Sequence, residues 1–351
     1  MAEGRGAQDQ ILTLALSILL SSMTTTAEVT RAWPITFDDV ERARERLVPH
    51  LTPTPFRRHP LLDEATGLTL FVKHENHQPT GSFKIRNGLS LMTALTPNER
   101  ARGVVAASTG NHGQGIAYGA ALVGTPATIC VPRGNNPEKN AAMRAWGATV
   151  VEQGRDYDDS VQAMLRIAKQ EGRVVAHSTN DPRIIAGAGT MTMEILEQAG
   201  AGGIDALVLA IGGGSQAVGA LTVAKQLAPN LEVYGVQASG APAQYESWRA
   251  REPRTTAEAH TFAEGVATRT SYELTFPALL EGLTDFVTLA EDEIAEGVRT
   301  ILSTTHNLVE GAGAMGVMGA KKLRERLTGK RVALVFCGGN LDSAVLRRIL
   351  K

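Results

Sequence analysis

The chain has 351 residues, of which 43% are hydrophobic and only 5% are aromatic, and its formal net charge is −1. This length suits about two domains that share a large core, and the balanced charge argues against a nucleic-acid partner or an anionic membrane surface. The two cysteines, Cys130 and Cys337, are too few for a disulfide framework and suit a reducing cytoplasm.

The first predicted feature is an apolar run at 11–20, which is too short to span a bilayer. It is also a poor signal peptide, because Glu3 and Asp9 precede it and no small-x-small cleavage site follows. We expect residues 1–30 to form a disordered extension, with a helix packed on a partner as the alternative. A helix with a threonine cap is predicted next, at 36–47.

Farther along the chain, short apolar runs alternate with helix-compatible segments. The predicted strands lie at 68–72, 103–107, 127–131, 149–152, 173–177, 206–211, 232–237, 286–289 and 331–336. Helix-compatible sequence lies between most of them, for example at 140–146, 157–170 and 217–227. This alternation predicts an α/β fold with parallel sheets that helices cover on both faces. The polar segment 248–261 is predicted to be a surface excursion within a domain.

The segment 74–87 contains the principal candidate for chemistry. Lys84 follows a Thr-Gly-Ser turn and Phe83, just before a predicted helix that begins near Ile85. An amine that is removed from water and surrounded by backbone donors loses its proton more readily and becomes a nucleophile for a carbonyl. An isolated lysine is far more often an exposed surface residue, so the later segments decide between the two interpretations.

Four later segments place small or polar residues after a predicted strand or at the start of a helix. Residues 106–115 expose backbone N–H groups suited to a carboxylate or phosphate, and Asn111 adds a side-chain amide. Residues 210–215 place three glycines and a serine where they form a phosphate cradle, although the spacing fits neither a P-loop nor a dinucleotide fingerprint. Cys337 follows the last predicted strand, where a thiol either meets a heterocyclic nitrogen or is simply buried. Glu310 opens a helix of small residues, where the helix dipole stabilises a carboxylate.

Taken in order, these segments resemble the fold-type II family of pyridoxal-phosphate enzymes, the tryptophan-synthase-β-like group, and within it the threonine/serine dehydratase and serine racemase branch. The resemblance covers residues 36–351. Its motifs are Gln78-x-Thr80-Gly81-Ser82-Phe83-Lys84, Ser108-x-Gly110-Asn111-His112, Ile185-Ala186-Gly187-x-Gly189-Thr190, Gly212-Gly213-Gly214, Phe262-Ala263-x-Gly265-Val266-Ala267, Glu310 and Gly338-Gly339-Asn340. It implies two domains with parallel-rich twisted sheets flanked by helices, and pyridoxal 5'-phosphate in the cleft between them. We expect a large domain of residues 31–100 and 183–351 and a small domain of residues 101–182.

The resemblance also implies roles for individual residues. Lys84 resembles the lysine that holds the cofactor as a Schiff base and acts as the base at Cα, and Phe83 resembles the residue beside the ring. Further cofactor contacts are implied for Asn111 at the phenolic oxygen, for Gly212, Gly213, Gly214 and Ser215 at the phosphate, for Cys337 at the pyridine nitrogen, and for Glu310. The loop that grips the substrate carboxylate is similar to Ser108, Thr109, Gly110, Asn111 and His112, and Thr109 is the candidate base on the second face.

Some departures from the family pattern affect the expected chemistry. Thr109 stands where the racemase branch has a serine. Gln237 and Ala243 stand where relatives that bind a divalent cation have two carboxylates, so we expect no metal site. The loop at 177–181 and Ala188 also differ from the common pattern, which leaves the side chain of the substrate open.

We expect a lyase that carries out β-elimination on a β-hydroxy amino acid such as threonine or serine, giving a 2-oxo acid and ammonia. The thiol of Cys337, unlike an aspartate, does not hold the pyridine nitrogen protonated, which favours elimination over transamination. An amino-acid racemase or a β-replacement synthase on the same scaffold is the alternative, and a binding protein that has kept the fold is a third possibility. We expect a cytoplasmic homodimer that binds a small amino-acid substrate and neither nucleic acid nor a membrane.

Overall fold

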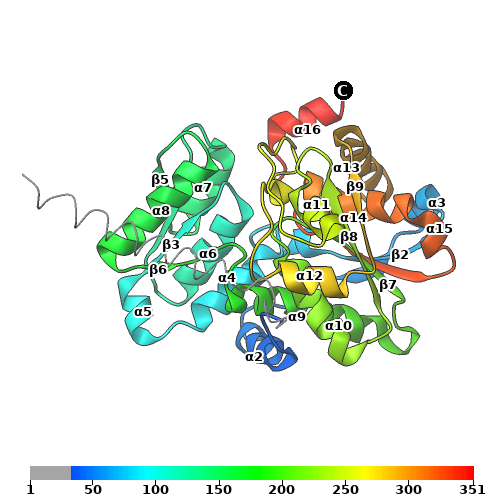
Figure 1. The fold of residues 1–351 in the computed structure, drawn as a ribbon, viewed down its shortest axis with the longest axis horizontal. Coiled ribbons are helices and arrows are strands. Elements are labelled where there is room, and N and C mark those ends of the chain that lie inside the picture. Colours follow the sequence, from blue (N-terminus) through cyan, green and yellow to red (C-terminus); the bar gives the residue numbers. More distant parts are fainter. Residues whose placement is uncertain (1–32) are drawn as a thin grey trace, which may run out of the picture. The chain divides into compact units, whose positions relative to one another are not determined.

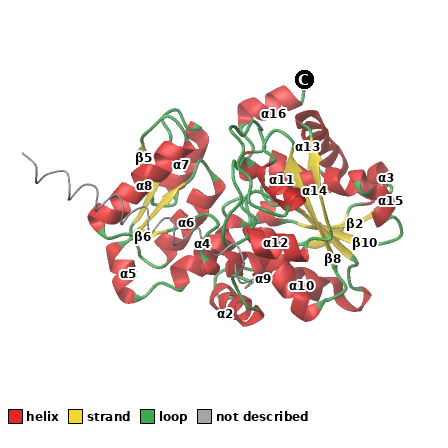
Figure 2. Ribbon diagram, in the orientation of Figure 1, coloured by secondary structure: helices red, strands yellow, loops and turns green. Residues whose placement is uncertain are grey.

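The computed structural model describes residues 33–351, and the extension expected at 1–30 lies outside the described residues. Within the described range, helices and strands alternate along the chain, as Figures 1 and 2 show. The strands of this range form one sheet of six strands and one sheet of four. The predicted alternation is therefore present and is divided between two sheets.

The six-stranded sheet contains the strand that leads into the lysine segment. Its strands are β1 (Phe56–Arg58), β2 (Thr69–Lys73), β7 (Ala206–Ala210), β8 (Glu232–Ala238), β9 (Asp285–Leu289) and β10 (Arg331–Val335). Their spatial order is β1-β2-β10-β7-β8-β9. Neighbouring strands from β2 to β9 are parallel. The carboxyl ends of these strands, and the loops that follow them, therefore lie at one edge of the sheet.

Strand β1 departs from the prediction of parallel pairing. It pairs with β2 antiparallel, with Arg57 opposite Val72. Its side chains are partly or fully exposed, so the segment lacks the apolar run that identifies a buried strand in sequence. The ends of the strands that were predicted differ from the observed ends by no more than two residues.

The four-stranded sheet is parallel throughout. Its strands are β3 (Val104–Ala107), β4 (Ala127–Val131), β5 (Thr149–Glu152) and β6 (Val174–Val175), in the order β5-β4-β3-β6. Strands β3 and β4 are buried along their whole length, which agrees with their continuous apolar sequence. The loops after these strands also share one edge of their sheet.

Helices cover both sheets. They are α2 (Phe37–Leu47), α3 (Pro60–Thr66), α4 (Lys84–Thr93), α5 (Pro97–Arg102), α6 (Asn111–Leu122), α7 (Pro137–Ala145), α8 (Tyr157–Glu171), α9 (Pro182–Ala199), α10 (Ser215–Leu227), α11 (Ala243–Ala250), α12 (Phe276–Gly282), α13 (Glu291–Thr305), α14 (Gly311–Lys322), α15 (Arg324–Leu327) and α16 (Ser343–Ile349), with short 3₁₀ turns η1 (Glu75–His77), η2 (Gly200–Gly202) and η3 (Glu264–Val266). The predicted surface excursion begins inside α11 and continues as mostly exposed chain at 251–260. Among the described helices, none combines the length and the apolar character needed to cross a membrane.

Helix α4 packs closely against α6 and α9. A Cβ atom at Gly88 would lie 2.1 Å from the carbonyl oxygen of Gly115 in α6, and one at Gly187 in α9 would lie 2.5 Å from the carbonyl oxygen of Arg86. A larger residue at either crossing would force the helices apart. Because α4 begins at Lys84, these glycines determine where the lysine lies relative to α6 and α9.

Candidate active site

The loops at the carboxyl ends of strands in both sheets line a pocket with a volume of about 720 Å³. From the four-stranded sheet come residues 107–112, at the end of β3, and residues 132–137, after β4. From the six-stranded sheet come residues 212–216, after β7, and Cys337, after β10. Ligands of open α/β sheets bind at such strand ends, so this pocket is the candidate active site.

The residues predicted to form the site all line this pocket. They are Phe83, Lys84, Ser108, Thr109, Gly110, Asn111, His112, Gly212, Gly213, Gly214, Ser215, Glu310 and Cys337. They come from separate segments of the chain, so the fold and not the local sequence brings them together.

Lys84 is the first residue of α4, and its amine lies in the pocket. The amine donates a hydrogen bond to the carbonyl oxygen of Ser178, with an N···O distance of 3.3 Å. Burial lowers the pKa of Lys84 to about 8, and the nearby Cys337 and Glu310 partly oppose that shift. A larger fraction of the amine is therefore neutral near physiological pH than for an exposed lysine.

A chain of hydrogen bonds holds Asn111 at the start of α6. Its side-chain nitrogen donates to Glu310 Oε1 at 2.7 Å, and its side-chain oxygen accepts from Asn340 Nδ2 at 2.7 Å. Asn340 also donates to the carbonyl oxygen of Thr80, at 2.9 Å, in the turn before Lys84. Asn340 was part of a family motif but was not predicted as a site residue, and its contacts make it the link between the lysine turn and Asn111.

Glu310 lies directly before α14 and accepts the hydrogen bond from Asn111 that ends this series. Burial raises the pKa of its carboxyl group, while the hydrogen bond from Asn111 opposes the rise. A Cβ atom at Gly338 would lie 2.5 Å from Glu310 Oε1. The glycine at 338 therefore gives the carboxylate the space that it occupies beside Asn111.

The glycine loop between β7 and α10 presents backbone N–H groups at the start of a helix. Gly214 precedes α10 with a φ of 95°, in the left-handed region that favours glycine. Among residues 33–351, no group accepts a hydrogen bond from the backbone N–H of residues 213–215. A Cβ atom at Gly213 would lie 1.9 Å from Thr179 Oγ1, so a side chain does not fit here. Free N–H groups at a helix N-terminus are suited to an anion such as a phosphate group.

Gln216 is a pocket residue that the sequence did not reveal. Its side chain is 5% exposed, and its amide nitrogen has no hydrogen-bond partner in the described part of the chain. A buried donor without a partner is costly, so this donor, next to the glycine loop, is suited to a bound polar ligand. A glutamine after a Gly-Gly-Gly-Ser loop gives no distinctive pattern in the sequence.

The loop at 108–112 is held from within and leaves other backbone donors free. Ser108 Oγ accepts hydrogen bonds from the N–H groups of Gly110 and Gly113, at 3.2 and 2.9 Å. His112 Nε2 lies 2.9 Å from the carbonyl oxygen of Ala176. Burial, and then the positive charge of Lys84, lower the pKa of His112 to about 3, so its ring is neutral and donates to that carbonyl.

Cys337 is 3% exposed and lies directly after β10. Its carbonyl oxygen accepts a hydrogen bond from the N–H of Phe83 at 2.9 Å, which ties the lysine turn to the end of the central strand. Burial, and then the nearby Glu310, raise the pKa of the Cys337 thiol well above its ordinary value. The thiol therefore remains protonated and neutral.

Two polar contacts cross the pocket between loops of the two sheets. Lys139 in α7 forms an ion pair with Glu264 in η3, with an N···O distance of 2.6 Å. Asn136, before α7, also donates a hydrogen bond to Asp342, before α16. The sequence did not predict these pairs because their members follow strands of different sheets.

The α/β fold thus brings a buried lysine of lowered pKa into one pocket with a helix start that presents backbone N–H groups. The chain belongs to the pyridoxal-phosphate dependent enzyme family, which matches residues 47–338. The predicted family, the fold class and the dependence on pyridoxal phosphate are therefore confirmed.

The chain is similar to curated proteins along most of its length. It is 36% identical to the L-threonine ammonia-lyase of Thermotoga maritima, over 90% of this chain and 78% of that protein. It is 34% identical to the L-threo-3-hydroxyaspartate ammonia-lyase of Pseudomonas sp, over 90% of this chain and 98% of that protein.

Two solved structures have the same fold. The T.th. threonine deaminase matches with a TM-score of 0.83 and 34% identity, covering 88% of this chain and 99% of that chain. The maize serine racemase matches with a TM-score of 0.85 and 26% identity, covering 91% of this chain and 97% of that chain.

Proposed function

We propose that this protein is an ammonia-lyase that converts a β-hydroxy amino acid, such as threonine or serine, into a 2-oxo acid and ammonia. The observation that carries the proposal is the Lys84 amine, whose pKa is lowered to about 8 by burial, in one pocket with the glycine loop 212–215. The relatives named as threonine and hydroxyaspartate ammonia-lyases support the same reaction class.

In this proposal Lys84 has two functions. It would hold pyridoxal phosphate covalently, since a neutral amine attacks an aldehyde. It would also take the proton from the Cα atom of the substrate. When bound, the cofactor supplies an electron sink for the bond that is broken at Cα. The lowered pKa of Lys84 supports both functions, because each requires the neutral amine.

The backbone donors of the pocket are assigned to two different anionic groups. The N–H groups of residues 213–215 and the side-chain amide of Gln216 would hold the phosphate, with Ser215 adding a hydroxyl. The free N–H groups at 109, 111 and 112 would hold the carboxylate of the substrate, since within the described chain no acceptor takes them. Phe83 would lie beside the ring, Asn111 and Glu310 at its oxygen side, and Cys337 at its nitrogen.

A racemase is the second candidate, because serine racemases and a pyridoxal 5'-phosphate-dependent aspartate racemase have the same fold at 26–29% identity. Racemisation requires an acid on the face of Cα opposite to Lys84. Thr109 is the candidate, and its extra methyl group restricts its side-chain rotamers. We therefore propose that elimination dominates, and that Thr109→Ala retains most of the lyase turnover.

The experiment that tests the function is product analysis from single substrates. Purified protein with cofactor is given L-threonine, L-serine or L-threo-3-hydroxyaspartate, and ammonia, 2-oxo acid and the enantiomers of the substrate are measured over time. Release of ammonia and oxo acid in equal amounts, abolished in Lys84→Ala, supports the lyase. A D-enantiomer that forms faster than oxo acid would overturn this proposal in favour of the racemase.

We also propose that the large domain comprises residues 31–100 and 183–351, that the small domain comprises residues 101–182, and that the protein is a cytoplasmic homodimer. The presence of two sheets supports the division into domains, and the two unpaired cysteines suit a reducing compartment. Light scattering on the purified protein measures its mass in solution, and a monomeric mass would contradict the dimer.

A further inference from the structure

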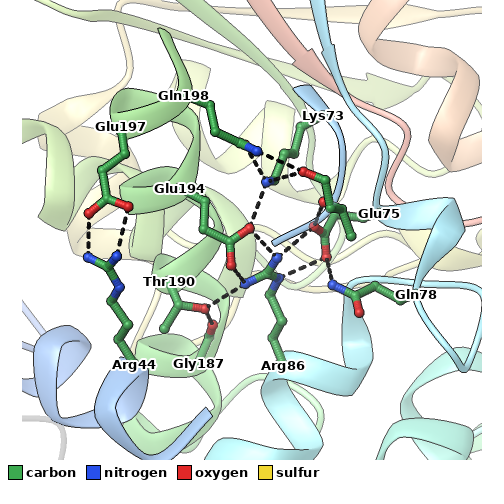
Figure 3. A network of polar contacts seen from close by, with 11 residues as sticks. Arg44, Lys73, Glu75, Gln78, Arg86, Gly187, Thr190, Glu194, Glu197 and Gln198 are labelled. Carbon is green, nitrogen blue, oxygen red and sulfur yellow. Dashed lines mark hydrogen bonds and ion pairs between the residues drawn. The ribbon is translucent and has the colours of Figure 1, made fainter. Parts of the chain in front are cut away.

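A buried cluster of charged side chains connects the first turn of α4 to Glu75 and to α9 (Figure 3). Its centre is Arg86, which is 1% exposed and stands two residues after Lys84. Residues two apart on a helix point to nearly opposite sides. Arg86 therefore points into the core while Lys84 points into the pocket.

The guanidinium group of Arg86 uses each of its N–H groups. It donates to Glu75 through Nε (2.8 Å) and Nη2 (2.9 Å), to Glu194 through Nη1 (2.7 Å) and Nη2 (2.7 Å), and to Thr190 Oγ1 through Nη1 (3.2 Å). These contacts account for the five donors of an arginine. Because the donors form a rigid planar fork, two carboxylates in these positions allow essentially one orientation of the side chain.

The charges of the cluster balance. Lys73, which is fully buried, donates to Glu194 Oε2 at 2.6 Å and to Gln198 Oε1 at 2.7 Å. Lys73 and Arg86 thus neutralise Glu75 and Glu194. Burial by itself would raise the pKa of the Glu75 carboxyl, but Arg86, Thr54 and Lys73 together outweigh burial and hold that pKa below its ordinary value. The carboxyl group of Glu75 therefore remains ionised in the folded protein.

The cluster holds both ends of the segment 75–86, which carries Lys84. Glu75, at the start of this segment, also accepts a hydrogen bond from Gln78 Nε2 at 3.1 Å. Arg86, at its end, closes the segment back onto Glu75. Glu194 adds a contact to α9, so the first turn of α4 is held against two elements. Lys84 lies between these held points.

A network of buried ion pairs is not in itself evidence of high stability. Apolar side chains of similar volume often stabilise a core as well as, or better than, a buried ion network. An apolar side chain does not fix the orientation of the helix that carries it, because its dispersion contacts tolerate rotation. A guanidinium group that is bidentate to two carboxylates does not tolerate such rotation.

We propose that Arg86 is a positioning residue, whose pairing with Glu75 and Glu194 orients the first turn of α4 and thereby directs the Lys84 amine into the pocket. This inference rests on the proposed function of Lys84. It predicts that a substitution which removes the guanidinium group of Arg86 but keeps its positive charge changes the surroundings of the Lys84 amine more than it changes the fold.

The main test uses Arg86→Lys and reads out Lys84 without any turnover. In cofactor-free protein, the rate at which acetic anhydride modifies Lys84 is measured against pH by peptide mass spectrometry. We expect the midpoint of this pH profile, which is the pH at which the modification rate of Lys84 is half-maximal, to move by about half a pH unit or more from that of the wild type. In the holoenzyme we expect kcat to fall about 10- to 100-fold with little change in KM, because a displaced group costs rate more than binding.

Two control variants separate positioning from stability. Arg44→Lys alters the bidentate ion pair between Arg44 in α2 and Glu197 in α9, the helix that also carries Glu194 (Figure 3). We expect this variant to change neither the midpoint nor kcat. Leu327→Ala removes a fully buried side chain in α15 and provides a variant with a comparable loss of thermal stability. If Arg86→Lys matches Leu327→Ala in midpoint and kcat, the cluster is only structural and the proposal is overturned.

Should Arg86→Lys fail to fold, Thr190→Val decides the question, since it removes the Thr190 contact to Arg86 at nearly constant volume, together with the hydrogen bond from Thr190 to the carbonyl oxygen of Gly187. A midpoint that differs from that of the wild type, together with a lower kcat, supports positioning, and an unchanged midpoint with unchanged kcat overturns it. The modification rates do not depend on the reaction that is catalysed. A wild-type protein without lyase activity would therefore contradict the proposed function while leaving this test readable.

Discussion

At the scale of single residues, the environment of Lys84 makes a direct prediction. Because burial lowers the pKa of its amine to about 8, acylation of Lys84 in cofactor-free protein should be half-maximal near that pH. In the holoenzyme, borohydride reduction and peptide mapping should place the cofactor on Lys84. A label on another lysine would contradict the assignment of this residue.

A second residue, His74, makes the stability of the protein depend on pH. Burial, and then His77 and His59, lower the pKa of His74 to about 3. Since this is below the value of about 6.5 in an unfolded chain, the unfolded state binds the proton more readily. The stability from neutral His74 is therefore complete above about pH 6.5 and is lost as the pH falls toward 3.

Urea unfolding at pH 7.5 and pH 5.0 measures this effect. At pH 5 we expect His74 to have removed about 2 kcal/mol from the free energy of unfolding. His74→Phe, which does not titrate, should lose correspondingly less stability between the two pH values, although His112 will still contribute. An equal loss in the two proteins would assign the pH dependence to other groups.

At the scale of elements, the crossing of α4 and α6 determines the distance between Lys84 and Asn111. A Cβ atom at Gly115 would lie 2.3 Å from the carbonyl oxygen of Lys84. We expect Gly115→Ala to lower the free energy of unfolding by about 1–3 kcal/mol through overpacking. It should also lower kcat, because Asn111 moves with α6.

The matched control for this prediction is Gly316→Ala in α14, where the nearest atoms to an added Cβ lie at 3.3 and 3.4 Å. Urea unfolding and steady-state kinetics are measured on both variants. Similar kinetics in both would show that the site does not depend on the close approach of α4 and α6.

At the scale of the whole molecule, we expect the pocket to close around the substrate. Loops from both sheets line it, and the ion pair of Lys139 with Glu264 connects them across the pocket. Substrate that contacts loops of both proposed domains should draw them together. Crystals of the free protein and of a substrate-analogue complex test this, and identical placement of the loops 108–112 and 212–215 would count against closure.

A second prediction at this scale concerns divalent cations. Gln237 is fully buried, and its side-chain oxygen accepts a hydrogen bond from the N–H of Tyr245 at 2.9 Å. Ala243 offers only a methyl group. Mg²⁺ and Ca²⁺ require charged or carbonyl oxygen ligands, so we expect activity to survive EDTA. A large loss that Mg²⁺ restores would place a cation site elsewhere in the protein.

Local sequence was sufficient for most of the elements and for the candidate site residues that form local patterns. Strands that are buried on both faces, such as β3 and β4, are continuous apolar runs and were predicted within a residue of their observed ends. The small-residue loops and Lys84 form local patterns, so they were also recognisable. Strand β1 was missed because its exposed residues lack such a pattern.

The sequence by itself determined which segments form strands and helices, which lysine is the candidate nucleophile and which family the chain resembles, because each depends on neighbouring residues. Tertiary structure alone decided the strand order, the link from Asn340 through Asn111 to Glu310, and the cluster around Arg86. Their partners lie far apart in the chain: Asn111 and Glu310 are separated by 199 residues, and Arg86 and Glu194 by 108. Contacts at such separations depend on how the crossover connections place the strands, which no local pattern encodes.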